Sequence, residues 1–184
     1  MIYFFKPLPE REVNFPDAHP FIKNKWFNKN YMKFVYALQI LLVLLSIYLR
    51  VWDFLNWHVE FIIFCIVFLV HEILHVLVIY GIGDISITHS GVFFWINSDG
   101  IMSKKRFWLF MTLPLLVLTI VPVFFTFWTK GLLFEVLRYI AWINAIIAGS
   151  DIINSVLIAV KPAKAEFYRG YYRIKTEVDQ GEKL

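Results

Sequence analysis

Four long apolar stretches constrain the fold of this chain more than any other feature. They cover residues 34–49, 61–80, 107–129 and about 139–160, and charged residues or glycines bound most of their ends. At a helical rise of about 1.5 Å per residue, such stretches are long enough, or nearly so, to cross the hydrocarbon core of a bilayer. With 59% hydrophobic and only 17% charged residues, the chain is too apolar for a soluble domain of 184 residues. The sequence therefore predicts an all-α membrane protein with four transmembrane helices.

The distribution of basic residues predicts the orientation of these spans, because Lys and Arg accumulate in short cytoplasmic loops. Three groups of basic residues fall on one side. One precedes the first span, one separates the second span from the third, and one follows the fourth: Lys23, Lys25, Lys29 and Lys33; Lys104, Lys105 and Arg106; and Lys161, Lys164, Arg169, Arg173 and Lys175. Only three basic residues fall on the other side: Arg50, Lys130 and Arg138. Both termini are therefore predicted to be cytoplasmic. The net charge of +4 fits attraction to anionic lipid headgroups, and nucleic-acid binding is not needed to explain it.

The chain shows no internal repeat, low-complexity tract or linker, so we expect a single integral membrane domain over residues 1–184. It would comprise a cytoplasmic or interfacial N-terminus at residues 1–33, a four-helix membrane core at residues 34–160 and a cytoplasmic tail at residues 161–184. The first thirty residues lack a continuous apolar segment, so no cleavable signal peptide is expected. The single cysteine, Cys65, excludes an internal disulfide.

The segment after the second span, residues 84–97, follows a different pattern. Apolar residues alternate on both sides of Ser90-Gly91, at Ile85, Ile87, Val92, Phe94 and Ile96. This alternation predicts a short β-hairpin, and one of its strand edges would hold an extended peptide beside a site on the second span. The alternative is a re-entrant segment that plugs the bundle, with two aromatic residues facing lipid, Phe93 and Trp95.

The second span contains the ionisable sequence His71-Glu72-Ile73-Leu74-His75. Residues four apart share one face of a helix, so the two imidazoles can bind one metal ion while Glu72 stands beside it to activate a bound water. A charge at the centre of a membrane helix costs roughly 2.5 to 3.5 kcal/mol, so such a cluster indicates a functional site. A buried histidine pair that only hydrogen-bonds to neighbouring helices is the alternative.

A catalytic zinc site usually takes three protein ligands and leaves a fourth position open for water. Asp151 is the candidate for the third ligand, because it is the only acidic residue within the fourth span. His71 lies ten residues before Gly81 and Asp151 ten residues before Lys161, which places both about 15 Å from the cytoplasmic ends of their helices. The fourth span also carries polar residues whose ordinary role is to hydrogen-bond between helices, and two of them are candidates for contacts behind the metal ligands: Asn144 and Asn154.

These motifs resemble those of the putative zincin peptidase family of small multipass bacterial membrane proteins, which is similar to the site-2 intramembrane zinc metalloproteases. The resemblance rests on the His-Glu-x-x-His sequence, on Leu113-Pro114-Leu115 in an apolar span, and on residues 149–154. It implies peptide-bond hydrolysis in or beside the membrane, with Zn²⁺ held by three ligands and a carboxylate as catalytic base: His71, His75 and Asp151, with Glu72. The sequence departs from the site-2 pattern at the third ligand, where Ser150-Asp151-Ile152 stands in place of Leu-Asp-Gly.

The expected function is therefore an intramembrane zinc metalloendopeptidase in a multipass protein of the bacterial cell membrane. Its partners would be membrane lipids and a membrane-associated or transmembrane peptide substrate. One alternative is a non-catalytic zinc-binding membrane protein that acts in assembly or sensing, although a structural site normally closes four ligands around zinc. A transporter is the other, although it needs a more continuous polar path than the outer halves of the second and third spans offer.

Overall fold

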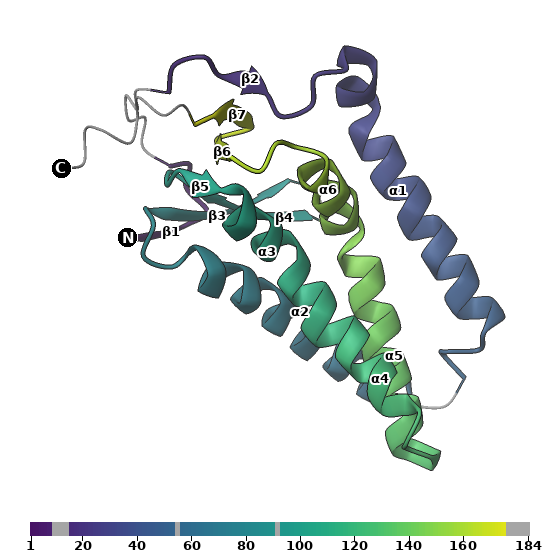
Figure 1. Ribbon diagram of the computed structural model, residues 1–184. Helices are drawn as coiled ribbons and strands as arrows, with labels where there is room; N and C mark the ends of the chain where they lie inside the picture. The colour runs from purple at the N-terminus through teal and green to yellow at the C-terminus, as the bar shows by residue number, and fades with distance from the viewer. Residues whose placement is uncertain (9–14, 54–55, 91–92, 176–184) are drawn as a thin grey trace.

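The computed structural model describes residues 1–8, 15–53, 56–90 and 93–175, and most of these residues are helical (Figure 1). The first two predicted spans form α1, Lys25–Tyr48, and α2, Trp57–Ile79. An asparagine begins each helix by accepting a backbone N–H bond: Asn24 from Phe27 at 3.0 Å and Asn56 from His58 at 3.1 Å. Both helices are long and apolar enough to cross a membrane.

The third predicted span is one helical rod made of three pieces. These are α3, Lys104–Leu115, the π-helical turn η1, Leu116–Ile120, and α4, Val121–Thr126. Pro114 lies inside α3 and Pro122 at the start of α4, and the π turn lies between these two prolines, which disturb regular helical hydrogen bonding. The whole rod, Lys104–Thr126, is also apolar and long enough to cross a membrane.

The fourth predicted span is a bent pair of helices rather than one helix. It consists of α5, Gly131–Ile147, and α6, Gly149–Ala159, which meet at 65°. Gly149 allows the side chain of Gln39 on α1 to approach the bend, because a Cβ at position 149 would lie 2.7 Å from Gln39 Cγ. Gln39 Nε2 also donates to the carbonyl of Ile146 at 3.0 Å. The chain thus has three helices able to span a membrane in its described part, or four if the bent pair counts as one span.

The predicted hairpin is confirmed by β3, Ile85–Ser90, and β4, Phe93–Ser98, which pair antiparallel. Its turn at residues 91–92 lies outside the described residues. A third strand, β1, Ile2–Phe4, pairs parallel with β3, so the strand order of this sheet is β1-β3-β4. Strand β3 is therefore interior, and β4 forms one edge of the sheet.

A second sheet shows that the all-α expectation needs correction. It has the strand order β2-β7-β6-β5, made of His19–Pro20, Tyr171–Ile174, Ala165–Tyr168 and Met102–Ser103. Residues 165–174, expected as part of a tail, form the β6–β7 hairpin, whose turn residues Arg169 and Gly170 both have positive φ, 43° and 80°. The hairpin packs on the helices through a small core that contains Ile158, Phe167 and Tyr172.

Both sheets and both described chain ends lie at one end of the helices, and the connection between α4 and α5 lies at the other (Figure 1). Two lysines join segments at the sheet end of the molecule. Lys161 Nζ donates to the carbonyl of Phe21 at 2.7 Å and stands 4.3 Å from the ring centre of Tyr172. Burial lowers the pKa of Lys161 from its ordinary value, while its interaction with Tyr172 acts in the opposite direction. Lys104 Nζ donates to the carbonyl of Ala159 at 2.8 Å and so joins the start of α3 to the end of α6.

This arrangement allows a direct test of orientation. We expect Lys105→Cys and Lys164→Cys, both in a Cys65→Ser background, to react with a membrane-impermeant maleimide only after the cells are permeabilised. Lys130→Cys, in the connection between α4 and α5, should react in intact cells, because the excess of basic residues at the sheet end predicts a cytoplasmic location for that end. The Cys65→Ser protein is the unlabelled control. Labelling of positions 105 and 130 from the same side would contradict the predicted topology.

Candidate metal centre

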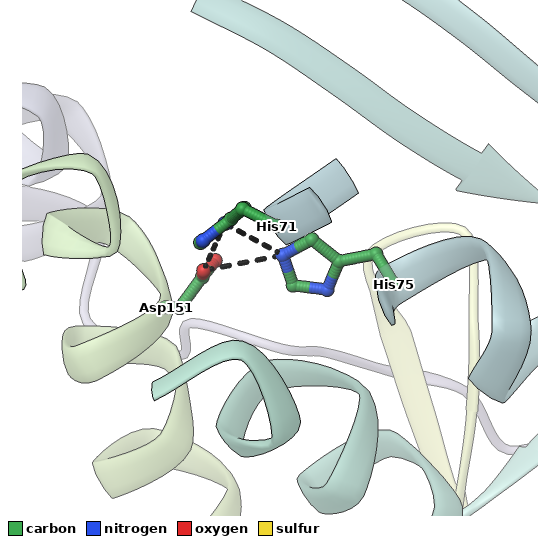
Figure 2. Close-up of side chains that lie close together, drawn as sticks. All are labelled: His71, His75 and Asp151. Carbon is green, nitrogen blue, oxygen red and sulfur yellow. Dashed lines mark hydrogen bonds and ion pairs between the residues drawn. The ribbon is translucent and has the colours of Figure 1, made fainter. Parts of the chain in front are cut away.

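Three side chains from two helices meet at one buried point. His71 and His75 lie one turn apart on α2, and Asp151 lies in the first turn of α6 (Figure 2). Asp151 Oδ2 is 3.1 Å from His71 Nε2 and 3.2 Å from His75 Nε2, and the two Nε2 atoms are 3.1 Å apart. Each residue is at most 7% exposed. The three ligands suggested by the sequence are therefore in contact with one another.

Hydrogen bonds on the far side of each imidazole determine where its proton lies. His71 Nδ1 is 2.9 Å from Asn144 Oδ1, and His75 Nδ1 is 2.7 Å from the carbonyl oxygen of Phe110. Because both oxygens can only accept a hydrogen bond, each Nδ1 donates, and in a neutral ring each Nε2 then presents a lone pair. Two lone pairs and a carboxylate oxygen thus face one another. Such a set of acceptors needs a positive charge between them, which a metal ion or a proton can supply.

The spacing and chemistry of this set fit zinc. With metal–ligand bonds of about 2.0 Å, two ligands of a tetrahedral ion lie about 3.3 Å apart, close to the observed separations of 3.1 and 3.2 Å. Two imidazoles and one carboxylate are also a common ligand set of catalytic zinc, in which the fourth position takes water. The three residues line a cavity of about 450 Å³ together with Glu72, which leaves room for that water.

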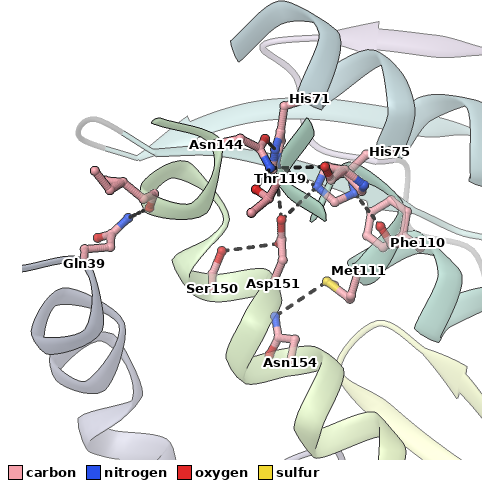
Figure 3. Close-up of polar contacts among 12 residues, drawn as sticks. Gln39, His71, His75, Phe110, Met111, Thr119, Asn144, Ser150, Asp151 and Asn154 are labelled. Atoms are coloured by element: carbon pink, nitrogen blue, oxygen red, sulfur yellow. Dashed lines mark hydrogen bonds and ion pairs between the residues drawn. The ribbon is translucent and has the colours of Figure 1, made fainter. Parts of the chain in front are cut away.

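Asn144, at the end of α5, holds His71 through a network that includes the π turn. Its Nδ2 donates to Thr119 Oγ1 at 2.9 Å (Figure 3) and to the carbonyl of Pro114 at 3.1 Å. Thr119 in turn donates to the carbonyl of Ala141 at 3.2 Å. The two donor contacts fix the amide so that its oxygen faces His71. Asn144 therefore contacts one of the candidate metal ligands on the side away from Asp151, which is the position of a residue that orients a ligand.

Asn154, the other candidate, has a different position. Its Oδ1 accepts a hydrogen bond from Tyr31 at 3.0 Å, and its Nδ2 points to the sulfur of Met111 at 3.9 Å (Figure 3). It lines the cavity of the metal centre, but in the contacts of the described residues it does not hold a ligand. Ser155 donates to the carbonyl of Ile152 at 2.8 Å, which is a bond within α6 and not between helices.

Sequence reasoning missed the contributions of Phe110, Thr119 and Tyr31. Phe110 acts through its backbone carbonyl, so its side-chain type gave no indication. Thr119 lies in the π turn, and the sequence did not indicate that this turn directs Thr119 toward α5. Tyr31 precedes the first predicted span and belongs to the expected cytoplasmic or interfacial N-terminus, outside the predicted membrane core.

A second cavity, of about 490 Å³, adjoins the first at the sheet end of the molecule. Five residues line both cavities: Trp95, Ile96, Phe110, Met111 and Asn154. The second cavity also has an aromatic wall that includes Phe21, Phe107 and Phe167. Strand β4 thus runs past the metal centre and continues along the second cavity.

Comparison with known proteins gives one family. Residues 63–165 match a family described as "Putative zincin peptidase", and this range is more than half of the chain. It contains both histidines, Glu72 and Asp151. Neither the curated proteins nor the solved structures give a match.

The metal centre makes a prediction about zinc content. The purified wild-type protein should hold one zinc ion per chain, and His71→Ala and His75→Ala should lose most of it, because two remaining ligands are too few for the site. Asp151→Asn should also lower occupancy, since a neutral amide is a poorer zinc ligand than a carboxylate. His58→Ala is the matched control, because His58 lies on α2 outside the cluster. Elemental analysis of monodisperse protein from zinc-supplemented cells measures the outcome, and metal-free wild type would refute the assignment.

Proposed function

Because the chain belongs to the family described as putative zincin peptidases, we propose that it is an intramembrane zinc metalloprotease that cuts peptide bonds in or beside the membrane. The observation that carries this proposal is the convergence of His71, His75 and Asp151 on a cavity that Glu72 also lines. The helices around this cavity are long and apolar enough to cross a membrane. A peptide-cleaving centre between such helices would act on membrane-associated or transmembrane peptides.

Each residue of the centre has a defined task in this mechanism. His71, His75 and Asp151 would hold zinc, which supplies Lewis acidity and a bound water with a pKa near 7. Glu72 accepts the proton of the attacking water and returns it to the leaving nitrogen. The nitrogen therefore leaves as a neutral amine and not as an anion. Asn144 and the Phe110 carbonyl keep the two imidazoles in the tautomer that leaves each Nε2 lone pair available.

The open wall of the site favours an enzyme over a non-catalytic zinc protein. A structural zinc site normally has four protein ligands, and among the described residues three of the His, Cys, Asp and Glu side chains form the cluster. The remaining side opens to the cavity and to Glu72. A site used only for assembly or sensing needs neither the open side nor a base beside it.

Substrate binding in this proposal uses the edge of the three-stranded sheet. The backbone N–H of Phe5 donates to the carbonyl of Ile87 at 2.8 Å, and the N–H of Ile85 donates to the carbonyl of Met1 at 2.9 Å. The odd-numbered residues of β3 therefore direct their backbone groups toward β1. The expectation of a substrate-binding hairpin edge thus applies to β4 and not to β3.

The register of the hairpin shows which β4 groups remain for a substrate. Ser86 and Thr88 direct their backbone groups toward β4, where they lie opposite Asn97 and Trp95. Ile96 lies between these two residues, so its own backbone groups point to the outer edge of the sheet. Among the described residues, no strand pairs with that edge. Trp95 and Ile96 also line the cavity of the metal centre. An extended peptide added to β4 would lie beside the three metal ligands, with its flanking residues in the second cavity.

Membrane orientation completes the proposal. With the sheet end in the cytoplasm, the second cavity would lie near the cytoplasmic surface of a bacterial cell membrane, and both termini would be cytoplasmic. Water and the unwound part of a substrate would then reach the centre from that side. The basic residues at the sheet end would contact anionic lipid headgroups.

The catalytic role of Glu72 can be separated from zinc binding. Glu72→Gln should keep the fold and the zinc content but abolish hydrolysis, because an amide cannot accept the proton. Glu60→Gln is the matched control, since Glu60 lies on the same helix in its first turn, outside the metal cluster. The measurement compares membrane-proximal cleavage products, across the proteome, in cells that carry wild type, either variant or a deletion. A Glu72→Gln strain with the wild-type set of products would contradict the protease assignment.

The role of the β4 edge predicts a different phenotype. Ile96→Pro removes an outward-facing N–H without removing a bond between β3 and β4, so it should reduce cleavage severalfold or more while zinc content stays at one per chain. Phe4→Pro is the control, because by the same alternation Phe4 directs its N–H away from β3 at the opposite edge of the sheet. If the Ile96→Pro protein cleaves as well as the Phe4→Pro control, and both proteins are stable, then the β4 edge does not bind the substrate.

A further inference from the structure

We propose that Pro114 is a positioning residue of the metal centre, because its missing N–H leaves the Phe110 carbonyl available to orient His75. Pro114 lies inside α3, four residues after Phe110. In a regular α-helix, the N–H of residue 114 would donate to the carbonyl oxygen of residue 110. Proline has no N–H to donate, and its ring also pushes that carbonyl outward from the helix. A free acceptor therefore arises at position 110 without any polar side chain.

His75 takes up this acceptor. Its Nδ1 lies 2.7 Å from the Phe110 carbonyl oxygen, and its ring centre lies 4.6 Å from that of Phe110 (Figure 3). All three residues lie in the protein interior: Phe110 is 5% exposed, His75 is 6% exposed, and Pro114 is fully buried. A buried carbonyl and a buried imidazole N–H each cost free energy when unpaired, so the Phe110 carbonyl and the His75 Nδ1–H satisfy one another.

The same turn of α3 also acts on His71. The carbonyl of Pro114 accepts a hydrogen bond from Asn144 Nδ2 at 3.1 Å, and Asn144 Oδ1 contacts His71 Nδ1 at 2.9 Å. The carbonyls of residues 110 and 114 thus support the two imidazoles, one directly and one through an amide. One proline-containing turn would therefore fix the tautomer and the ring orientation of both histidines.

Restoring an N–H at position 114 should disturb this arrangement. The new donor would draw the Phe110 carbonyl back into the helical hydrogen-bond pattern and away from the line of His75 Nδ1. The His75 ring would then rotate more freely. It would less often adopt the tautomer that favours metal binding, in which Nδ1 carries the proton and Nε2 presents a lone pair. Contacts behind metal ligands are typically worth about 10- to 100-fold in metal affinity, so a change of that size is expected.

The experiment compares two replacements that differ at the N–H. Pro114→Ala introduces the N–H and removes the ring. Replacement of Pro114 by lactic acid, through suppression of a stop codon with the hydroxy acid, removes the same ring but provides an ester oxygen in place of the N–H. Thr112→Ala is the packing control: Thr112 is buried in the same helix and donates only to the carbonyl of Trp108, at 2.8 Å. The full-length protein in detergent is titrated with Zn²⁺ against a competing chelator, and the visible spectrum of its Co²⁺ form reports ligand geometry.

We expect Pro114→Ala to bind Zn²⁺ about 10- to 100-fold more weakly, with a changed Co²⁺ spectrum. The lactic acid variant and Thr112→Ala should stay close to wild type in both measurements. Equal weakening in the alanine and lactic acid variants would assign the effect to ring packing and overturn the proposal, as would wild-type affinity in both. The inference rests on the metal centre of the proposed function and not on its chemistry. A wild-type protein that binds zinc but cuts no peptide would refute the protease proposal and leave this one intact.

Discussion

Three hydrogen-bond acceptors that face one another inside an apolar helix bundle are the constraint on which this structure depends. Two imidazole nitrogens and a carboxylate oxygen at separations of 3.1 and 3.2 Å repel one another unless a cation lies between them. Apolar residues such as Ile66 and Leu69 are exposed on the surface of α2, which suits contact with lipid. The ionisable groups therefore depend on such a cation and on the hydrogen bonds behind each ring.

The two irregular parts of the helices, the bend between α5 and α6 and the π turn η1, lie beside the candidate metal centre. The 65° bend falls between Asn144 and Asp151, which in a straight helix would share one face but lie about 10 Å apart along the axis. The bend turns the end of α5 and the start of α6 toward the same point, where Asn144 supports His71 and Asp151 meets both histidines. The π turn η1 likewise places Thr119 against Asn144. Straight helices would pack more simply, but they would not bring these groups together.

The parts of this structure that follow local rules were predictable from the sequence. Apolar length gave the spans, the four-residue spacing gave the histidine pair, and the lone carboxylate in an apolar stretch gave Asp151. The hairpin at β3 and β4 was predicted because its strands are neighbours in the chain and alternate regularly. Strands β1 and β2 were not, because each has two or three residues and pairs with a strand more than eighty residues away. The Phe110 carbonyl was equally hidden, since backbone groups carry no residue-type signal and the proline that exposes one also occurs in ordinary membrane helices.

In the proposed function, the sheet edge and the metal centre would address two parts of one physical problem. A transmembrane peptide keeps its amides in helical hydrogen bonds, and these must open before a water can attack a carbonyl. Opening them in a low-dielectric setting is costly unless other partners replace them. Strand β4 offers such partners beside the ligands, because Trp95 and Ile96 line the same cavity as His71 and Asp151. A helical segment could therefore exchange its internal bonds for bonds to β4 within reach of Glu72, and the neighbouring second cavity would receive the side chains next to the cleaved bond. On this argument, the rate of cleavage should depend on how easily the substrate unwinds near the sheet end, so helix-breaking residues in a substrate would favour cleavage there.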